Sequence, residues 1–314
     1  MKDLRIVFMG TPEFAVASLQ ALVDAGHQVV GVITAPDRPA GRGRKLHASA
    51  VKKYALDKGL RLLQPTNLKD PYFLEELRSL RADLQIVVAF RMLPAQVWEQ
   101  PELGTFNLHA SLLPDYRGAA PINWAIINGE TRTGVTTFFI NEDIDTGSII
   151  LQREVPIGDS TYAGELHDLL MEVGSELVLE TVALIAAGEA VPKPQRAGKV
   201  KMAPKLNKEN CRIRWGLPMQ RIFDHIRGLS PYPAAWTQLQ NKEESTELKI
   251  FRSEMLQGNH DKKPGTVMVK GKQILVAVDS GYLNILELQL AGKRKMDAIS
   301  LLNGYRFEEG SQMI

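Results

Sequence analysis

The first residues of the chain contain a strand, a helix and a second strand in direct succession. LRIVFM (residues 4–9) and HQVVGVIT (27–34) are apolar, strand-like runs. Between them Thr11 can cap a helix, Pro12 suits its first position, and apolar side chains recur at helical spacing: Phe14, Ala15, Leu19, Leu22 and Val23. Two strands joined through a helix pair in parallel with a right-handed crossover, so this segment predicts the beginning of a parallel α/β sheet.

The same pattern continues to about residue 189. LQIVVAF (84–90), TFNLHAS (105–111) and GVTTFFI (134–140) predict further strands, and SIILQREVPI (148–157) predicts an antiparallel strand at the sheet edge. Residues 161–188 carry one long amphipathic helical pattern. We therefore predict a doubly wound, mostly parallel Rossmann-like α/β domain at residues 1–189.

The last third of the chain has a different pattern. Residues 190–208 contain three prolines and six basic residues with little apolar periodicity, which indicates a linker. GTVMV, KQILVAV and YLNILELQL then alternate across turns at residues 270–272 and 279–281, as in a three-strand meander. Residues 209–314 are therefore expected to form a small OB-like β-barrel, a fold that often binds nucleic acid.

Composition excludes several classes of protein. The single cysteine, Cys211, forms no internal disulfide and fits a reducing, cytoplasmic location. No apolar run approaches the ~20 residues of a membrane span, and the N-terminus has no signal-peptide pattern. The six histidines show no close metal-ligand spacing, so we expect no metal. The turn GTPEFA lacks the second glycine of a dinucleotide fingerprint, which argues against NAD even though Asp37 follows the second strand.

Charge is distributed unevenly along the chain. Residues 1–189 hold 17 Lys or Arg against 24 Asp or Glu, a net charge of −7, whereas residues 190–314 hold 21 against 12, a net charge of +9. Within the acidic part, residues 37–53 carry six basic residues and one acid, and their glycines and proline predict a mobile basic loop. Both basic regions can bind a phosphate backbone, and the alternative for both is a solvated basic surface.

The stretch FNLHASLLP (106–114) carries the candidate catalytic groups. Asn107 and His109 project from the same side of a strand, and the turn NEDIDTG after the strand at 134–140 presents Asp143 and Asp145. An amide, an imidazole and a carboxylate can stabilise an oxyanion, move a proton and orient the imidazole, which suits acyl transfer without a covalent enzyme intermediate. The alternative is a half-exposed strand with a polar outer face.

These motifs resemble a known family. FNLHASLLPDYRGAAPINWAIINGE followed by GVTTFFINEDIDTG resembles the folate-dependent formyltransferases. FMGTPEFA, the loop APDRPAGRGRKL, APKL (203–206) and PYPAAW (231–236) narrow the resemblance to the branch that acts on methionyl-tRNA. The matches extend from residue 5 to about residue 306.

The resemblance implies an activity and a site. The family transfers the formyl group of 10-formyltetrahydrofolate to the α-amine of initiator methionyl-tRNA, by direct attack through a tetrahedral intermediate. Asn107 would stabilise the oxyanion, a neutral His109 would accept the proton of the amine, and Asp145 would hold His109 and a positioning water. We expect a monomer. The folate site would be lined by Ser111, Leu112, Leu113, Pro114, Phe90 and Met92, and the tRNA would be bound by Arg38, Arg42, Arg44, Lys45 and Lys205.

One stretch departs from the family pattern, and two alternatives stay open. VVAFRMLP (87–94) is one residue shorter than the expected VVAYGxILP, with Phe90 and Arg91 in place of Tyr-Gly, at a segment expected to wall the pterin pocket. The nearest alternative is a related enzyme that formylates glycinamide ribonucleotide or an amino sugar, or hydrolyses formyltetrahydrofolate. The alternative of another class is a non-catalytic RNA-binding protein.

Overall fold

The structure is a computed structural model that describes residues 3–40, 45–196 and 198–314. The chain divides into two compact units. The first, here the N-terminal unit, comprises Met1–Gly118, Thr133–Val155 and His167–Met202. The second, the C-terminal unit, comprises Ala119–Arg132, Pro156–Leu166 and Ala203–Ile314. Two short segments from the front of the sequence thus belong to the C-terminal unit, and the sequence pattern did not predict this. The boundaries proposed at residues 189 and 208 stay a prediction.

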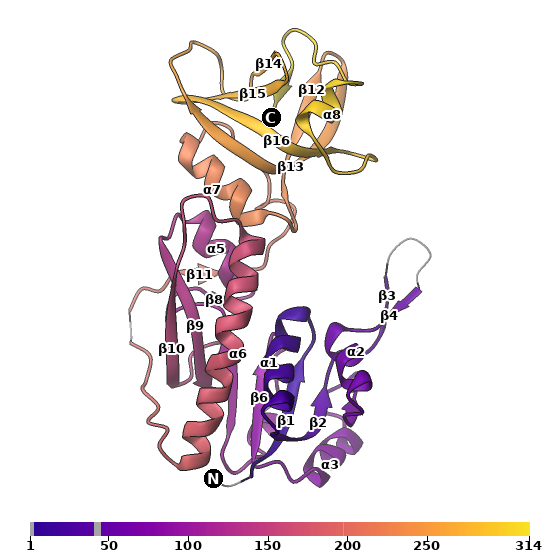
Figure 1. Cartoon of the computed structure of the whole chain (residues 1–314), viewed down its shortest axis with the longest axis vertical. Coiled ribbons are helices and arrows are strands. Elements are labelled where there is room, and N and C mark those ends of the chain that lie inside the picture. The colour runs from indigo at the N-terminus through magenta and orange to yellow at the C-terminus, as the bar shows by residue number, and fades with distance from the viewer. Residues whose placement is uncertain (1–2, 41–44, 197) are drawn as a thin grey trace. The chain divides into compact units, whose positions relative to one another are not determined.

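A seven-stranded sheet forms the centre of the N-terminal unit, with strand order β10-β9-β7-β6-β1-β2-β5 (Figure 1). Its strands are β1 (Arg5–Gly10), β2 (Gln28–Ile33), β5 (Leu62–Leu63), β6 (Leu84–Val88), β7 (Thr105–His109), β9 (Arg132–Phe139) and β10 (Ile149–Pro156). The pairs from β5 to β7 are parallel, and β9 runs antiparallel to β7. The predicted mostly parallel Rossmann-like sheet is confirmed, with β10 at its edge.

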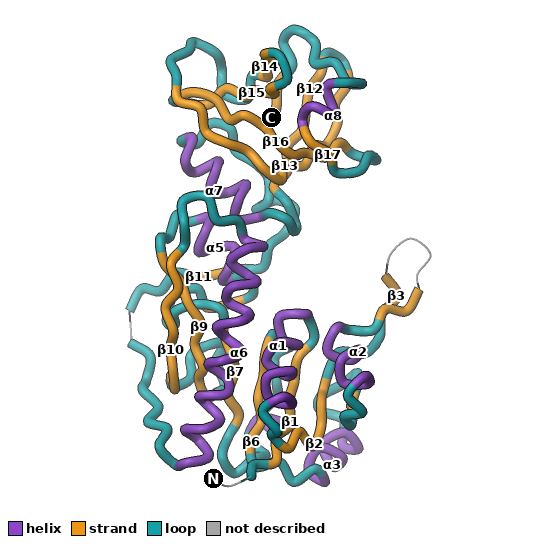
Figure 2. Tube along the Cα trace, viewed as in Figure 1, coloured by secondary structure: helices purple, strands orange, loops and turns teal. Residues whose placement is uncertain are grey.

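Helices pack on this sheet along their apolar faces. They are α1 (Glu13–Asp24), α2 (Ala50–Asp57), α3 (Pro71–Ser79), α4 (Ala95–Trp98) and α6 (Ala163–Ala187). The ring of Phe14 in α1 meets that of His167 in α6, so both helices lie on the same side of the sheet, as Figure 2 shows. Gly10 permits the tight turn into α1, because a Cβ there would lie 2.6 Å from the Cβ of Ala15. The N-cap of α1 is Pro12 without a side-chain hydrogen bond, so the predicted cap by Thr11 is wrong.

The basic segment after β2 is more regular than its glycines and proline suggested. β3 (Arg38–Ala40) and β4 (Lys45–His47) pair antiparallel, with Arg38 opposite His47. The prediction of an irregular loop over the whole of residues 37–53 is therefore wrong, because α2 also begins at Ala50. Glycine and proline break a helix but are compatible with a hairpin, which explains the error.

An antiparallel sheet of order β14-β15-β16-β13-β12-β18 dominates the C-terminal unit, with β17 beside β16. Its strands are β12 (Ala235–Asn241), β13 (Glu244–Gln257), β14 (Val267–Lys270), β15 (Gln273–Val278), β16 (Gly281–Leu290), β17 (Met296–Asp297) and β18 (Gln312–Met313). The helices of this unit are α5 (Pro121–Ile127), α7 (Met219–Leu229) and α8 (Ala298–Leu302), and the short strands β8 (Arg117–Gly118) and β11 (Met202–Ala203) complete the chain. The predicted meander is confirmed as β14, β15 and β16.

The longest strand of this sheet, β13, escaped the sequence analysis. Its pairing with β16 shifts register between Ile250 and Arg252, and both Ile250 and Phe251 are buried. A β-bulge at this point interrupts the alternation of buried and exposed residues that identifies a strand in a sequence.

Backbone hydrogen bonds join the two ends of the sheet into a barrel. The N–H of Val267 donates to the carbonyl of Ser311 at 2.9 Å, and the N–H of Met313 donates to the carbonyl of Gly265 at 2.8 Å. The first and last strands of the order are thereby linked around Thr266 and Gln312, which closes the sheet at that point. A cluster of buried aliphatic side chains, including Ile274, Leu283 and Leu288, fills the interior. The small barrel predicted for this part of the chain is thus confirmed.

Barrel closure depends on Gly265. Its φ is +86°, and a Cβ there would lie 2.1 Å from the carbonyl oxygen of Met313. We expect Gly265→Ala to lower the free energy of unfolding of the C-terminal unit by about 2–4 kcal/mol, from backbone strain together with the clash. Urea unfolding followed by the fluorescence of Trp215 and Trp236 measures this. Gly271→Ala is the matched control, since Gly271 has φ +62° and open space around it, and should cost about 1 kcal/mol. Equal losses in both variants would contradict the role of the clash.

Candidate active site

The candidate catalytic residues lie at the carboxyl edge of the parallel strands. β6 and β7 pair in parallel, so the segments that follow them, from Ala89 and from Ala110, begin at the same edge of the sheet. Open α/β sheets bind their ligands at this edge. Ala89 has φ +48°, a left-handed conformation that turns the chain sharply at the end of β6.

His109, the last residue of β7, is held in one orientation by a backbone carbonyl. Only 6% of the residue is exposed, and its Nε2 lies 2.8 Å from the carbonyl oxygen of Tyr116. A carbonyl oxygen can only accept a hydrogen bond, so Nε2 carries the proton and donates. In the neutral ring the lone pair is therefore on Nδ1, which is the nitrogen that can accept a proton.

Asp145 faces that second nitrogen. Its Oδ2 lies 3.8 Å from His109 Nδ1 and accepts a hydrogen bond from the N–H of Gly118 at 2.9 Å. Because β9 runs antiparallel to β7, β9 ends beside the first residues of β7, whereas His109 is the last residue of β7. The loop that carries Asp145 must therefore extend back toward His109. Asp145 does so with φ +55°, whereas Asp143 is exposed. Of the two aspartates in the predicted turn, only Asp145 reaches the histidine.

Asn107 projects from the same side of β7 as His109. The residue is half-buried, and in the described part of the chain no group forms a hydrogen bond with its side chain. A polar outer strand face would leave both side chains exposed, and the burial of His109 argues against that alternative. The arrangement offers an unpaired amide donor, an imidazole with a fixed proton and a carboxylate beside the imidazole.

Four of the six residues predicted to line the folate site, those at 111–114, occupy different environments. Ser111 is fully buried, and its hydroxyl donates to the carbonyl of Asp115 at 2.7 Å. Leu113 is buried and its carbonyl accepts from Gln152 Nε2 at 2.9 Å. Leu112 and Pro114 are half-buried, so a ligand can contact the exposed parts of their side chains.

The segment that departs from the family pattern is anchored by its arginine. Arg91 donates to the carbonyl oxygens of Pro65 and Thr66, and burial lowers the pKa of its guanidinium. Phe90 packs partly against the core cluster under β1 and β6, whereas Met92 is 66% exposed. Arg91 thus ties this segment to the loop after β5 and leaves Met92 on the surface.

The predicted tRNA-binding residues are only partly described. Arg38 and Lys205 are exposed. Arg42, Arg44 and the side chain of Lys45 lie outside the described residues. Nearby, Asp37 accepts from Lys52 Nζ at 2.7 Å and from Gln64 Nε2 at 3.0 Å, and these contacts lower the pKa of its carboxyl group. Its carboxylate is therefore occupied by protein groups rather than available to a ribose.

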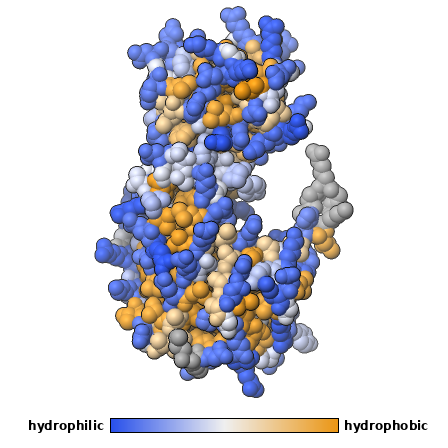
Figure 3. Space-filling view, in the orientation of Figure 1, coloured by the Kyte–Doolittle hydropathy of each residue, from blue (hydrophilic) through white to orange (hydrophobic). Residues whose placement is uncertain are grey.

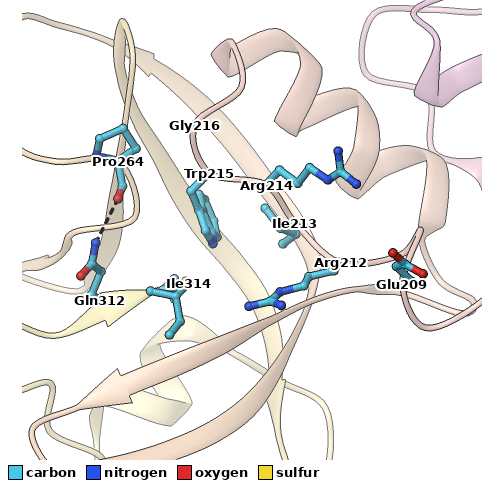
Figure 4. Close-up of a pocket in the computed structure, with 10 residues that line it drawn as sticks. Glu209, Arg212, Ile213, Arg214, Trp215, Gly216, Pro264, Gln312 and Ile314 are labelled. Carbon is cyan, nitrogen blue, oxygen red and sulfur yellow. Dashed lines mark hydrogen bonds between the residues drawn. The ribbon is translucent and has the colours of Figure 1, made fainter.

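The C-terminal unit has a pocket of ≈ 420 Å³ with basic and aromatic residues in its wall. Arg212, Arg214 and Trp215 line this pocket, and in Figure 4 the side chain of Arg214 extends away from Trp215. The cations of Lys208 and Arg212 lie 4.9 and 5.4 Å from the ring centre of Trp236. Figure 3 shows mainly hydrophilic residues on the visible face of this unit. Such a surface can bind an anion and stack an aromatic base.

Metal-binding groups and membrane-spanning helices can be assessed for the described residues, which leave out 1–2, 41–44 and 197. In that part of the chain no three His, Cys, Asp or Glu side chains are grouped so that they could hold a metal ion. Within the same residues no helix has both the length and the apolar character needed to span a membrane.

The sequence analysis missed the backbone groups that hold the candidate site. The Tyr116 carbonyl and the Gly118 N–H orient His109 and Asp145, and no residue type identifies such groups in a sequence. A family resemblance identifies side chains, whereas these contacts depend on how the loop from Ser111 to Gly118 folds.

Comparisons with known proteins agree along the whole chain. The model described as "Formyl transferase" matches residues 4–182, and that described as "Formyl transferase, C-terminal domain" matches residues 205–306. A methionyl-tRNA formyltransferase of Bacteroides fragilis is 56% identical and covers 99% of this chain and 98% of its own length. One of Flavobacterium johnsoniae is 54% identical and covers 100% of both chains.

Solved structures share the fold at low sequence identity. HypX of Aquifex aeolicus in complex with tetrahydrofolic acid has a TM-score of 0.67 at 18% identity, covering 96% of this chain and 47% of that one. An N-formyltransferase of Helicobacter canadensis, in complex with folinic acid and dTDP-3-aminofucose, has a TM-score of 0.65 at 21% identity, covering 93% and 100%. With two matching family models and relatives over half identical along its full length, the chain belongs to the formyl transferase family.

Proposed function

We propose that this protein transfers the formyl group of 10-formyltetrahydrofolate to the α-amine of initiator methionyl-tRNA. The observation that carries the proposal is the placement of His109 between the Tyr116 carbonyl and Asp145, beside the unpaired amide of Asn107. Relatives named methionyl-tRNA formyltransferase, 54–56% identical over the full length, support the choice of acceptor.

The three residues divide the chemistry of transfer. The amine nitrogen attacks the formyl carbon, and the carbonyl oxygen that becomes negative is stabilised by the Asn107 amide. The amine proton passes to Nδ1 of His109, because Nε2 already carries a proton and forms a hydrogen bond with the carbonyl oxygen of Tyr116. The carboxylate of Asp145 stabilises the resulting imidazolium. The bond from the formyl carbon to the folate nitrogen then breaks, and that nitrogen takes up the proton that the imidazolium of His109 gives back, which restores the neutral ring.

The residues at the carboxyl edge fit a folate. The exposed Met92 and the partly buried Phe90 offer apolar surface for a flat ring system, and Leu112 and Pro114 offer more from the neighbouring loop. Ser111 and Leu113 support this wall from inside, since both are buried and hydrogen-bonded. Arg91, which lies between Phe90 and Met92, holds this segment through its hydrogen bond to the Thr66 carbonyl.

Basic residues of both units are assigned to the tRNA. In the N-terminal unit these are Arg38, Arg42, Arg44 and Lys45, of which the side chain of Arg38 is described and is exposed. In the C-terminal unit they are Lys205, Lys208 over the ring of Trp236, and Arg212 and Arg214 in the wall of the pocket. We further infer that the protein acts in the cytoplasm and as a monomer.

The central prediction concerns Asn107 and the acceptor. Transfer of labelled formyl from 10-formyltetrahydrofolate should reach charged initiator tRNA and not glycinamide ribonucleotide. Asn107→Ala should lower kcat by roughly 100- to 1,000-fold, the usual loss when one oxyanion donor is removed. Single-turnover transfer with both acceptors measures this, and Asn303→Ala, which removes an exposed amide of the C-terminal unit, should leave kcat unchanged.

Each other result of this assay selects one of the alternatives. Transfer to glycinamide ribonucleotide would make the protein a related formyltransferase, and folate breakdown without an acceptor would make it a hydrolase. Binding of tRNA with no transfer to any acceptor would favour a non-catalytic RNA-binding protein. Full activity of Asn107→Ala would remove the amide from the mechanism.

A second prediction concerns the basic pocket. Arg212→Ala should raise the KM for tRNA and leave the KM for folate unchanged, because Arg212 is exposed and lies over Trp236 in the C-terminal unit. The slope of log affinity for tRNA against log salt should become less steep by about one unit. Arg81→Ala is the control, since Arg81 is exposed just before β6 begins, at the opposite edge of the sheet from the site. If Arg212→Ala binds tRNA with unchanged affinity, Arg212 is not part of the surface that binds tRNA.

A further inference from the structure

Residues 193–196 and 198–202, predicted only as part of a linker, contact both loops that hold His109. Lys193 exchanges two backbone hydrogen bonds with Ile149, each 2.8 Å long, just beyond the loop of Asp145. Lys201 accepts from the N–H of Tyr116 at 2.6 Å and donates its own N–H to Asp115 Oδ1 at 2.9 Å. The segment therefore contacts the loop on the Nε2 side of the imidazole and the loop on its Nδ1 side.

Gln195, near the start of this segment, forms hydrogen bonds with both the oxygen and the nitrogen of its side-chain amide. Its Oε1 accepts from Nε and Nη2 of Arg117, at 3.1 and 2.6 Å. Its Nε2 donates to the carbonyl oxygens of Asp145 and Gly147, at 2.8 and 2.9 Å. A carboxamide has two lone pairs on its oxygen and two N–H groups, so all four are satisfied here.

The residues held in this way are in conformations that need support. Tyr116 has φ +62° and Asp145 has φ +55°, both in the left-handed region that residues other than glycine rarely adopt. These are the two residues that face the two nitrogens of His109. Lys201 accepts a hydrogen bond from the backbone of Tyr116, and Gln195 donates one to the backbone of Asp145.

We propose that Gln195 is a positioning residue that sets the carboxylate of Asp145 against Nδ1 of His109. This proposal rests on the proposed function, because Gln195 acts through Asp145 and touches no reacting atom. Gln195 holds the Asp145 carbonyl while Arg117, on its other side, adjoins Gly118, whose N–H binds the Asp145 carboxylate. Without this amide the loop is free to relax out of its left-handed turn, which moves the carboxylate away from the imidazole.

Two substitutions separate the halves of the amide. Gln195→Ala removes both, whereas Gln195→Glu keeps an acceptor for Arg117 and places a second acceptor against the carbonyls of Asp145 and Gly147. Both should lower kcat roughly 10- to 100-fold in the formyl transfer assay, with the KM values for folate and tRNA unchanged. Gln20→Ala, an exposed glutamine of α1, is the matched control and should leave kcat unchanged. Recovery of activity by Gln195→Glu would assign the effect to Arg117 and overturn the proposal.

A double-mutant cycle with Asp145→Ala tests whether Gln195 acts through Asp145. If it does, adding Gln195→Ala to Asp145→Ala lowers kcat by less than two-fold further, whereas independent losses multiply. Multiplied losses overturn the proposal, including the case in which Gln195→Ala merely lowers Tm. Asn107→Ala in the same assay keeps the two claims apart. An inactive Asn107→Ala with a fully active Gln195→Ala refutes only the positioning role, and an active Asn107→Ala refutes the mechanism on which it rests.

Discussion

The hydrogen bond from His109 Nε2 to the Tyr116 carbonyl is the contact on which the candidate site depends. Both groups are buried, so the bond satisfies a carbonyl that would otherwise be costly to bury and fixes which nitrogen carries the proton. The free lone pair then lies on Nδ1, toward Asp145. The direction of one carbonyl group thus leaves Nδ1 as the nitrogen that can accept a proton.

The direction of that carbonyl is set by the loop between β7 and α5. Ser111 closes the loop by donating to Asp115, and Thr136 of β9 holds it from below through the Ser111 carbonyl and the Leu113 N–H. The chain reaches Tyr116 in a left-handed conformation, which costs energy that these contacts offset. The apolar core of the sheet positions β7, and the polar contacts of the loop position the chemistry.

Local patterns predicted those features that depend on local sequence. The strand–helix–strand unit, the meander across Gly271 and Ser280, and the shared face of Asn107 and His109 all follow from periodicity and turn residues. The strand β13 could not be found this way, because the bulge at Phe251 breaks its alternation. Contacts between residues far apart in the sequence could not be predicted from local patterns either. Gln195 lies fifty positions from Asp145, and the prolines and basic residues around Gln195 are typical of an ordinary linker. The roles of the site residues stay predictions.

The division of the chain into units changes how acceptor binding and catalysis can be separated. The chain enters the C-terminal unit at Ala119, directly after Gly118, and again at Ala203, shortly after Lys201. Gly118 binds the Asp145 carboxylate and Lys201 binds Tyr116, so the crossings adjoin contacts that hold His109. Removing everything after residue 190 would delete Gln195 and Lys201 along with the barrel. Loss of activity in such a fragment would therefore report on the catalytic geometry as well as on tRNA, and only point substitutions in the barrel isolate acceptor binding.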